Sequence, residues 1–229
     1  MIKQLVIAGC LLVGCLTVSQ VTAQVNIKVG YHAGYMNPKV NSLILNQYSY
    51  KRNWLDVPLE PFNSIQGVQL GLRYKLEFVG FELTWYNRYK TLRSEGDTPA
   101  NVPFDRNLYY RTVTYSFAME NYIGKFGFGG SFDVDNLRIR TLKSGRGDRF
   151  SLSQDFAYSS HFCIFYNFEA NDFLTVSIKP YCQYHWTTFN MLPLLEELEP
   201  DFNNSFDEKI FGDNFTNFGI MLIFYNGRP

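Results

Sequence analysis

The sequence predicts an all-β protein in which eight antiparallel strands form an up-and-down barrel. First, apolar and polar residues alternate through eight separate segments, which is the period of a strand with two different faces. Second, aromatic residues make up 17% of the 229 residues and are accompanied by 17 glycines, a composition typical of strands joined by tight turns. Third, short connections alternate with long ones along the chain, as they do in a barrel built from hairpins.

The composition also excludes several classes of protein. Lys and Arg number 21 and Asp and Glu number 21, and this balance argues against a nucleic-acid-binding protein, whose surface is usually basic. A mean hydropathy of −0.17 excludes a polytopic helical membrane protein. The high aromatic content excludes a disordered chain.

Residues 1–23 have the features of a secretory signal peptide. A short positive region ends at Lys3, an apolar stretch runs over 5–18, and small residues precede a cleavage site after Ala23. The apolar stretch is shorter than the roughly 20 residues that a transmembrane helix needs. We therefore expect export and a mature barrel domain over 24–229.

A second interpretation of the leader is a lipoprotein signal. The sequence Leu12-Val13-Gly14-Cys15 resembles a bacterial lipobox, which would place an acyl group on Cys15. Cleavage after Ala23 is favoured because the apolar stretch continues past Cys15. Both interpretations take the protein out of the cytoplasm.

The strands follow one another with little interruption, and each is long enough to cross a membrane at a tilt. In chain order, their apolar faces begin at Val25, Val68, Val79, Val113, Phe126, Phe156, Leu174 and Phe218. The predicted strands are 25–36, 65–74, 79–89, 108–120, 126–140, 156–168, 173–186 and 214–225. Pro180 interrupts the seventh strand, where we expect a β-bulge.

The connections fall into two classes. Those predicted as long external loops are 37–64, 90–107, 141–155 and 187–213, and those predicted as short periplasmic turns are 75–78, 121–125 and 169–172. Long loops on one side and short turns on the other are the plan of an outer-membrane barrel. Cys163 and Cys182 fall on opposite faces of neighbouring strands, so we expect no disulfide.

Alternation alone does not say which face lies inside the barrel. In a membrane barrel the apolar face meets lipid, whereas in a soluble, lipocalin-like barrel it surrounds a ligand. Glycines gather on the polar face, where a crowded interior needs small residues, and aromatic residues gather near both ends of the strands as two girdles. These features favour the bacterial outer membrane, with its lipids and lipopolysaccharide as partners.

With these features, the mature chain resembles the small eight-stranded outer-membrane barrels of OmpA/OmpX type. The Gly- and Tyr-rich first strand, which starts directly at Gln24, is similar to those of Bacteroidota, PorT-like members included. The resemblance covers 24–229 and is one of pattern, without a motif that selects a subfamily. The chain departs from the pattern at its end, which runs from Phe224 to Pro229 where such barrels place a terminal aromatic residue.

Charged residues of both signs lie on the polar face and are expected inside the barrel. An eight-stranded barrel has an interior just wide enough for side chains, and charges there must pair. We therefore expect a structural ion-pair network formed by Lys28, Arg73, Glu82, Arg88, Glu120, Asp133 and Lys179. Mixed signs favour mutual neutralisation over a selective pore.

The sequence offers no convincing catalytic, metal or cofactor site. His32, His161 and His185 lie on separate strands without the spacing of metal ligands. Ser160 and His161 superficially resemble part of the active site of barrel enzymes that modify lipid A, but neighbouring residues of a strand face opposite sides. We expect no enzyme activity and no cofactor.

The loop at 187–213 is strongly acidic, with a net charge of −6. Pro193 can start a short helix with one apolar side. This candidate docking element consists of Leu194, Leu195, Glu196, Glu197 and Leu198. A divalent-cation site near lipopolysaccharide and a merely solvated loop are the alternatives for this segment.

We therefore predict a non-enzymatic outer-membrane barrel that acts through its external loops as a structural or interaction protein. An accessory subunit of a surface or secretion complex is one such role, with other outer-membrane proteins as partners and no nucleic acid. The alternatives are a narrow porin-like channel, a lipid-modifying barrel enzyme and a soluble periplasmic ligand-binding barrel.

Overall fold

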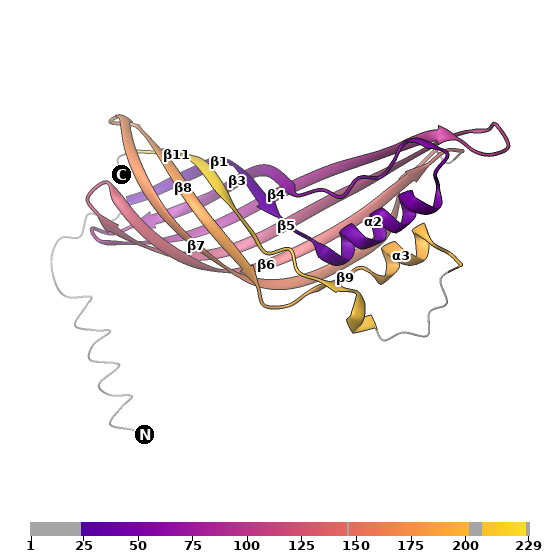
Figure 1. Cartoon of the computed structure of the whole chain (residues 1–229). Helices are drawn as coiled ribbons and strands as arrows, with labels where there is room; N and C mark the ends of the chain where they lie inside the picture. Colours follow the sequence, from indigo (N-terminus) through magenta and orange to yellow (C-terminus); the bar gives the residue numbers. More distant parts are fainter. Residues whose placement is uncertain (1–23, 146, 202–207, 228–229) are drawn as a thin grey trace, which may run out of the picture.

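Eight long strands close into one antiparallel barrel in the computed structural model, which describes residues 24–145, 147–201 and 208–227 (Figure 1). Their bounds are β1 Gln24–Met36, β3 Ser64–Lys75, β4 Val79–Asp97, β5 Pro103–Ile123, β6 Phe126–Lys143, β7 Phe150–Asn171, β8 Leu174–His185 and β11 Asn217–Asn226. Each long strand pairs with its neighbours in the chain, and β1 pairs with β11 to close the ladder. The predicted eight-stranded up-and-down barrel is confirmed. The predicted signal peptide, Cys15 included, lies outside the described residues.

Two of the connections expected as long loops are largely strand. β4 and β5 stay paired from Val79 with Asn121 up to Asp97 with Pro103, and β6 and β7 continue to Thr141 with Phe150. The prediction of loops over 90–107 and 141–155 is therefore wrong. The two hairpins project beyond the rest of the barrel at the end opposite the termini (Figure 1).

The other two long connections contain helices and short strands. The first holds α2 Lys39–Lys51 and β2 Leu55–Val57, and the second holds β9 Phe189–Asn190, α3 Leu192–Leu198, η1 Glu208–Phe211 and β10 Gly212–Asp213. Pro193 stands in the first turn of α3, so the predicted short helix is confirmed. α2 and α3 lie beneath the projecting hairpins (Figure 1).

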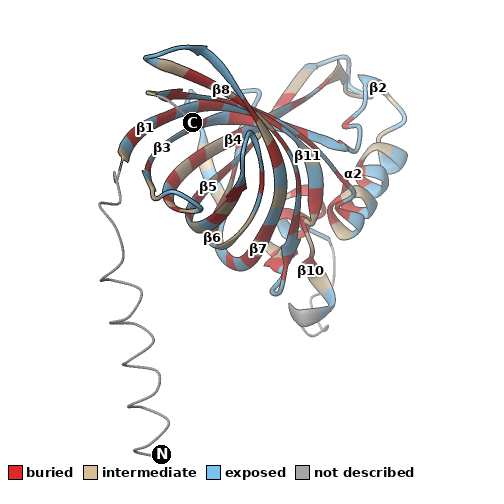
Figure 2. Cartoon of the chain, turned by 90° about the vertical axis from the view of Figure 1, so that its left-hand side faces the viewer, coloured by how far each residue is buried: buried red, intermediate tan, exposed pale blue. Residues whose placement is uncertain are grey.

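The two faces of the barrel wall differ in the way that the alternation predicts. Buried and exposed residues alternate along the strands (Figure 2). Outward-facing Leu83 and Phe162 are 60% and 61% exposed, whereas inward-facing Arg73 and Lys179 are at most 1% exposed. Exposed large apolar side chains and buried charges are the reverse of the usual arrangement in water. Within the described residues, no helix is long and apolar enough to cross a membrane, a finding that does not bear on crossing by β-strands.

Pro180 does not produce the expected bulge. It pairs in register with Ile220 of β11, and the β7–β8 pairings on both sides of Pro180 keep a single register. Proline lacks a backbone N–H, so its only effect here is the loss of one hydrogen-bond donor between strands. No extra residue is inserted, as a bulge would require. The irregularity between β7 and β8 lies instead between Glu169 and Asn171, near the turn.

The two cysteines lie on opposite faces of the wall, as predicted. Cys163 is half-buried and lines the lumen, and Cys182 is exposed on the outside. Both are free thiols.

Candidate functional site: a filled lumen under a helical cap

Glu82 is the centre of an ion-pair cluster in the half of the lumen near the short turns. Its carboxylate lies 2.6 Å from Lys28 Nζ and 3.3 Å from Lys179 Nζ, and it accepts a 2.5 Å hydrogen bond from the Tyr225 hydroxyl. Lys179 also pairs with Glu120. Each of these side chains is buried, and the five residues come from five strands. Two lysines therefore neutralise two carboxylates across the barrel axis.

Arg73 is buried beside this cluster without a carboxylate partner among the described residues. Its guanidinium donates to Asn26 Oδ1 at 2.9 Å and lies 3.7 Å from the centre of the Tyr225 ring. The contact with the ring face is a cation–π interaction, which stabilises a desolvated cation.

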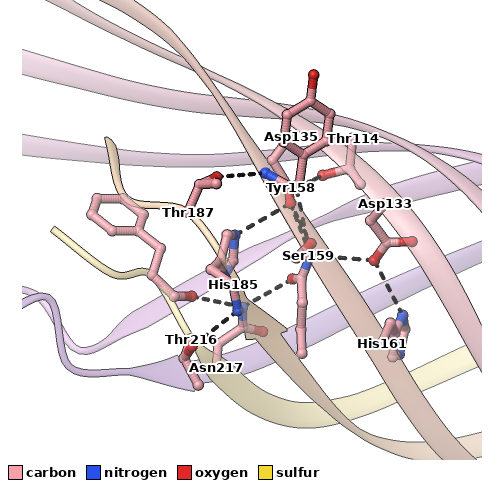
Figure 3. Close-up of polar contacts among 12 residues, drawn as sticks. Thr114, Asp133, Asp135, Tyr158, Ser159, His161, His185, Thr187, Thr216 and Asn217 are labelled. Carbon is pink, nitrogen blue, oxygen red and sulfur yellow. Dashed lines mark hydrogen bonds and ion pairs between the residues drawn. The ribbon is translucent and has the colours of Figure 1, made fainter. Parts of the chain in front are cut away.

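Asp135 is the centre of a second cluster, which lies farther along the lumen from the short turns and is drawn in Figure 3. Arg88 Nη2 lies 2.7 Å from it, Ser159 Oγ donates to it at 2.6 Å, and Thr114 donates to the same carboxylate. His185 Nε2 lies 3.2 Å away. Asp135 was not among the seven residues predicted for the network, although it lies on the same face of β6.

Asp133, which was among them, has no Arg or Lys partner within the described part of the chain. It accepts a 2.6 Å hydrogen bond from Ser131 and lies 4.0 Å from His161 Nδ1. Arg88 pairs with Asp135 instead, because the strand register places Arg88 level with Thr112 of β5 and Leu137 of β6, which is nearer to Asp135 than to Asp133.

The lumen contains little free space. In the described part of the chain, two cavities between its side chains are about 10 Å³ each, which is the space of about one water molecule. One cavity is lined by His32, His161 and Tyr181, and both ring nitrogens of His32 are buried without a protein partner. Neither cavity can hold an organic ligand.

The serine, aspartate and histidine of the second cluster are not arranged as a nucleophile and its base. Ser159 donates its proton to Asp135 and accepts a 2.8 Å hydrogen bond from Gln183 Nε2. A hydrolytic serine instead needs a base that receives its proton. Ser160 and His161 occupy successive, oppositely facing positions of β7, as expected, and no group of three or more metal-ligating side chains occurs in the described ranges.

α2 and α3 form a cap over the end of the lumen opposite the chain termini (Figure 1), and the cap has its own hydrophobic core. This core joins the two helices to the inner faces of β4 to β7. Its main members are Ile44, Leu45, Tyr48, Leu92, Leu108, Tyr110, Leu137, Ile139, Ala157, Leu192, Leu194, Leu195 and Leu198. The expectation that Leu194, Leu195 and Leu198 offer an apolar docking surface is therefore wrong, because all three are at most 2% exposed.

The acidic side chains of α3 point away from this core. Glu196 is exposed, and Glu197 lies 3.2 Å from Arg106 of β5. Only the polar side of the predicted docking element is thus accessible.

Asp213, from the second long connection, caps the N-terminus of α2. Its Oδ2 accepts a 2.7 Å hydrogen bond from the backbone N–H of Asn41, whose side chain accepts one from Tyr110 at 2.8 Å. No side chain of α2's own N-cap position makes such a bond. Burial raises the pKa of Asp213, and its hydrogen bonds with the first backbone N–H groups of α2 offset part of that rise.

Glu199 joins the C-terminal ends of the two helices. Lys51 Nζ and Arg52 Nη1 each lie 2.6 Å from one of its carboxylate oxygens, and Arg52 also donates to the carbonyl of Leu198 at 3.0 Å. Burial by itself would raise the pKa of Glu199, but the hydrogen bonds from Lys51 and Arg52 outweigh it and lower that pKa. The two loops are thus held together at both ends of α2.

Comparison with known proteins gives only distant likenesses. No protein-family model and no curated protein sequence match the chain. Among solved structures, the attachment invasion locus protein Ail of Yersinia pestis, in complex with the heparin analogue sucrose octasulfate, is 11% identical, with a TM-score of 0.38, over 90% of this chain and 97% of that one. Neisserial surface protein A is 8% identical, with a TM-score of 0.41, over 90% and 99%.

The outer membrane protein OprG from Pseudomonas aeruginosa is 11% identical, with a TM-score of 0.36, over 91% of this chain and 95% of that one. Likenesses this weak do not extend to function. The assignment of this chain as an eight-stranded barrel rests on its own strand pairing.

Proposed function

We propose that this protein is a closed, non-conducting outer-membrane barrel that carries a rigid external platform for interactions. The observation that carries the proposal is the inverted wall, which is apolar on the outside, together with a lumen filled by ion pairs and closed by a cap. An enzyme or a ligand carrier would need a cavity that this lumen does not offer.

The outer surface supports a membrane location. Large apolar side chains are exposed on every long strand, such as Ile27 on β1, Phe117 on β5 and Ile164 on β7. Soluble monomers rarely expose continuous apolar patches of more than a few hundred Å², and a bilayer would cover this one. Tyr115, Tyr158 and other aromatic residues lie near the external end of the band, as in the aromatic girdle of membrane barrels.

The alternatives of a soluble carrier and a porin-like channel are less well supported. A soluble barrel of lipocalin type would hold its apolar face inside, where this barrel holds Glu82, Lys179 and Arg88. A channel would need a continuous aqueous path, whereas the ion pairs join strands on different sides of the lumen.

The projecting hairpins are the best candidate for the interacting part. β4 and β5 pair as far as Asp97 and Pro103, and the cap packs against their inner face. A hairpin that is braced in this way presents its tip without the entropy cost of ordering a loose loop. Partners would be other outer-membrane proteins, as in a surface or secretion complex, and a Bacteroidota, PorT-like relationship stays a prediction.

Purification from native membranes in mild detergent tests this function. One variant has 97–103 and 143–150 replaced by Asn-Gly turns, and the control carries the same turn in place of 124–125 at the other end. We expect both variants to fold and only the first to lose co-purifying proteins. If the trimmed barrel keeps every partner, the hairpin tips are not the interaction surface.

A further inference from the structure

Four arginines lie on the outer face of the wall, just beyond the apolar band. This arginine belt consists of Arg111 on β5, Arg138 and Arg140 on β6, and Arg149 immediately before β7. Arg111, Arg140 and Arg149 are exposed, and Arg138 is half-exposed. The belt occupies one side of the barrel, where β5, β6 and β7 are neighbours.

The register of the strands places the belt at one depth. Arg111 lies twelve residues along β5 from outward-facing Ile123, and Arg138 lies twelve residues along β6 from outward-facing Phe126. At about 3.4 Å per residue and a tilt of about 40°, both lie about 30 Å above the short turns. An apolar band in such barrels is about 25 Å tall, so the belt falls at the level of the external lipid headgroups.

Within the belt, like charges face one another. Arg111 pairs directly with Arg138 across β5 and β6, and Tyr109 pairs with Arg140. Like charges at directly opposed positions of a sheet are destabilising. The Arg149 guanidinium lies 3.8 Å from the centre of the Tyr109 ring, which adds a further cation to the same area.

No member of the belt has a carboxylate partner in the described part of the chain. Arg111 Nε instead donates to Asn87 Oδ1 at 2.7 Å, and Arg138 Nε donates to Asn136 Oδ1 at 3.3 Å. In the described part of the chain, the other arginines on the outside of the barrel are paired, Arg93 with Glu95 and Arg52 with Glu199. The chain therefore leaves its cations unneutralised at the depth where a lipid headgroup would meet them.

We propose that the arginine belt binds the phosphate groups of lipid A, the membrane anchor of lipopolysaccharide in the outer leaflet. The inference rests on the proposed outer-membrane location. Arginine presents a planar fork of N–H donors that suits phosphate oxygens, and a bridging phosphate between Arg111 and Arg138 would convert their repulsion into attraction. The Asn87 and Asn136 contacts hold the two guanidiniums in place for this role.

The test measures binding of bisphosphorylated lipid A to the purified barrel in a nonionic detergent. The variant is Arg111→Gln with Arg138→Gln and Arg140→Gln. The control is Lys39→Gln with Lys75→Gln and Lys125→Gln, which removes the same charge from exposed or half-exposed positions outside the belt and the hairpin tips. At about fivefold per arginine near an anionic surface, we expect the triple variant to bind on the order of 100-fold more weakly. The control should bind as the wild type does.

Two further arms identify the ligand. Dephosphorylated lipid A should bind the wild type as weakly as the bisphosphorylated form binds the triple variant, and inorganic phosphate at the same concentration should not compete. In the absence of lipid, the triple variant should be at least as stable as the wild type, because the opposed charges are gone. If the triple variant fails to fold, Arg138→Gln alone should bind about fivefold more weakly.

Equal binding of lipid A by the triple variant and the wild type would overturn the proposal. Equal binding of the dephosphorylated lipid, or binding of a sulfated polysaccharide without binding of lipid A, would also overturn it. Failure of the outer-membrane proposal is distinguishable, because the wild type would then not insert into phosphatidylcholine vesicles at all.

Discussion

The amino group of Lys28 lies 2.6 Å from Glu82 Oε2, and both side chains are buried inside the barrel. The two residues are 54 positions apart in the sequence and belong to different strands. Lys179 forms the same kind of ion pair with Glu82 and with Glu120. The interior of this half of the barrel is therefore filled by paired charges.

Replacing Glu82 with Gln should destabilise the barrel strongly. Removing one partner of a buried ion pair leaves an uncompensated charge, and the typical cost is about 3–5 kcal/mol. Urea unfolding in detergent micelles measures this change. The double variant Lys28→Met with Glu82→Gln should recover part of the loss, and strictly additive costs would show that the two residues do not act as a pair.

Leu83, the next residue on β4, faces the other way, and Leu83→Arg tests the outer face. We expect a cost of about 2–4 kcal/mol for an arginine near the middle of the bilayer. Ala100→Arg, at the exposed tip of the β4–β5 hairpin, is the control and should cost little. Equal stabilities in lipid vesicles would mean that the band does not face lipid.

Much of the barrel could be predicted from the sequence because successive side chains of a strand point to opposite faces of the sheet. Once Leu83 is placed outside, Glu82 and Thr84 must lie inside, and the same rule holds for Lys28 and Lys179. The pairing partners could not be predicted in the same way. Asp133 and Asp135 share one face of β6, and only the stagger between strands decides that Arg88 reaches Asp135.

The cap could not be predicted from the sequence because its signals there are weak. In α2, Val40, Ile44 and Tyr48 recur at helical spacing and mark one apolar side, but the segment lies between strong strand patterns and lacks a capping side chain of its own. Its cap, Asp213, comes from the other long connection. The apolar side of α3 was recognised, but not the protein surface that buries it.

Leu195→Ala should loosen the cap while leaving the barrel intact. The residue is 2% exposed in the cap core, and a Leu-to-Ala change in a packed core costs about 2–5 kcal/mol. Leu43→Ala on α2 is the matched control, because Leu43 is 68% exposed. Hydrogen exchange should become faster over α2 and α3 in the first variant only. Unchanged exchange would show that the two helices are not held by this core.

The cap should also open at acidic pH. The pKa of Glu199 is lowered in the folded state, so its contribution to stability is present above its unfolded pKa and is lost as the pH falls through the folded value. Asp213 has a raised pKa and opposes this trend. In the wild type, hydrogen exchange over α2 should become faster below about pH 4.5. In the variant Glu199→Gln, this increase should be absent. If exchange still becomes faster at low pH in this variant, a group other than Glu199 causes the opening of the cap.

Planar-bilayer conductance tests the central claim most directly, because an open lumen conducts ions and a filled lumen does not. Reconstituted barrels that are shown to be folded by their faster migration on unboiled gels should give no discrete current steps. Barrels with 190–212 replaced by a short Gly/Ser linker should also stay silent, because the ion pairs around Glu82 and Asp135 close the lumen below the cap. Regular single-channel steps from the intact folded barrel would contradict the account.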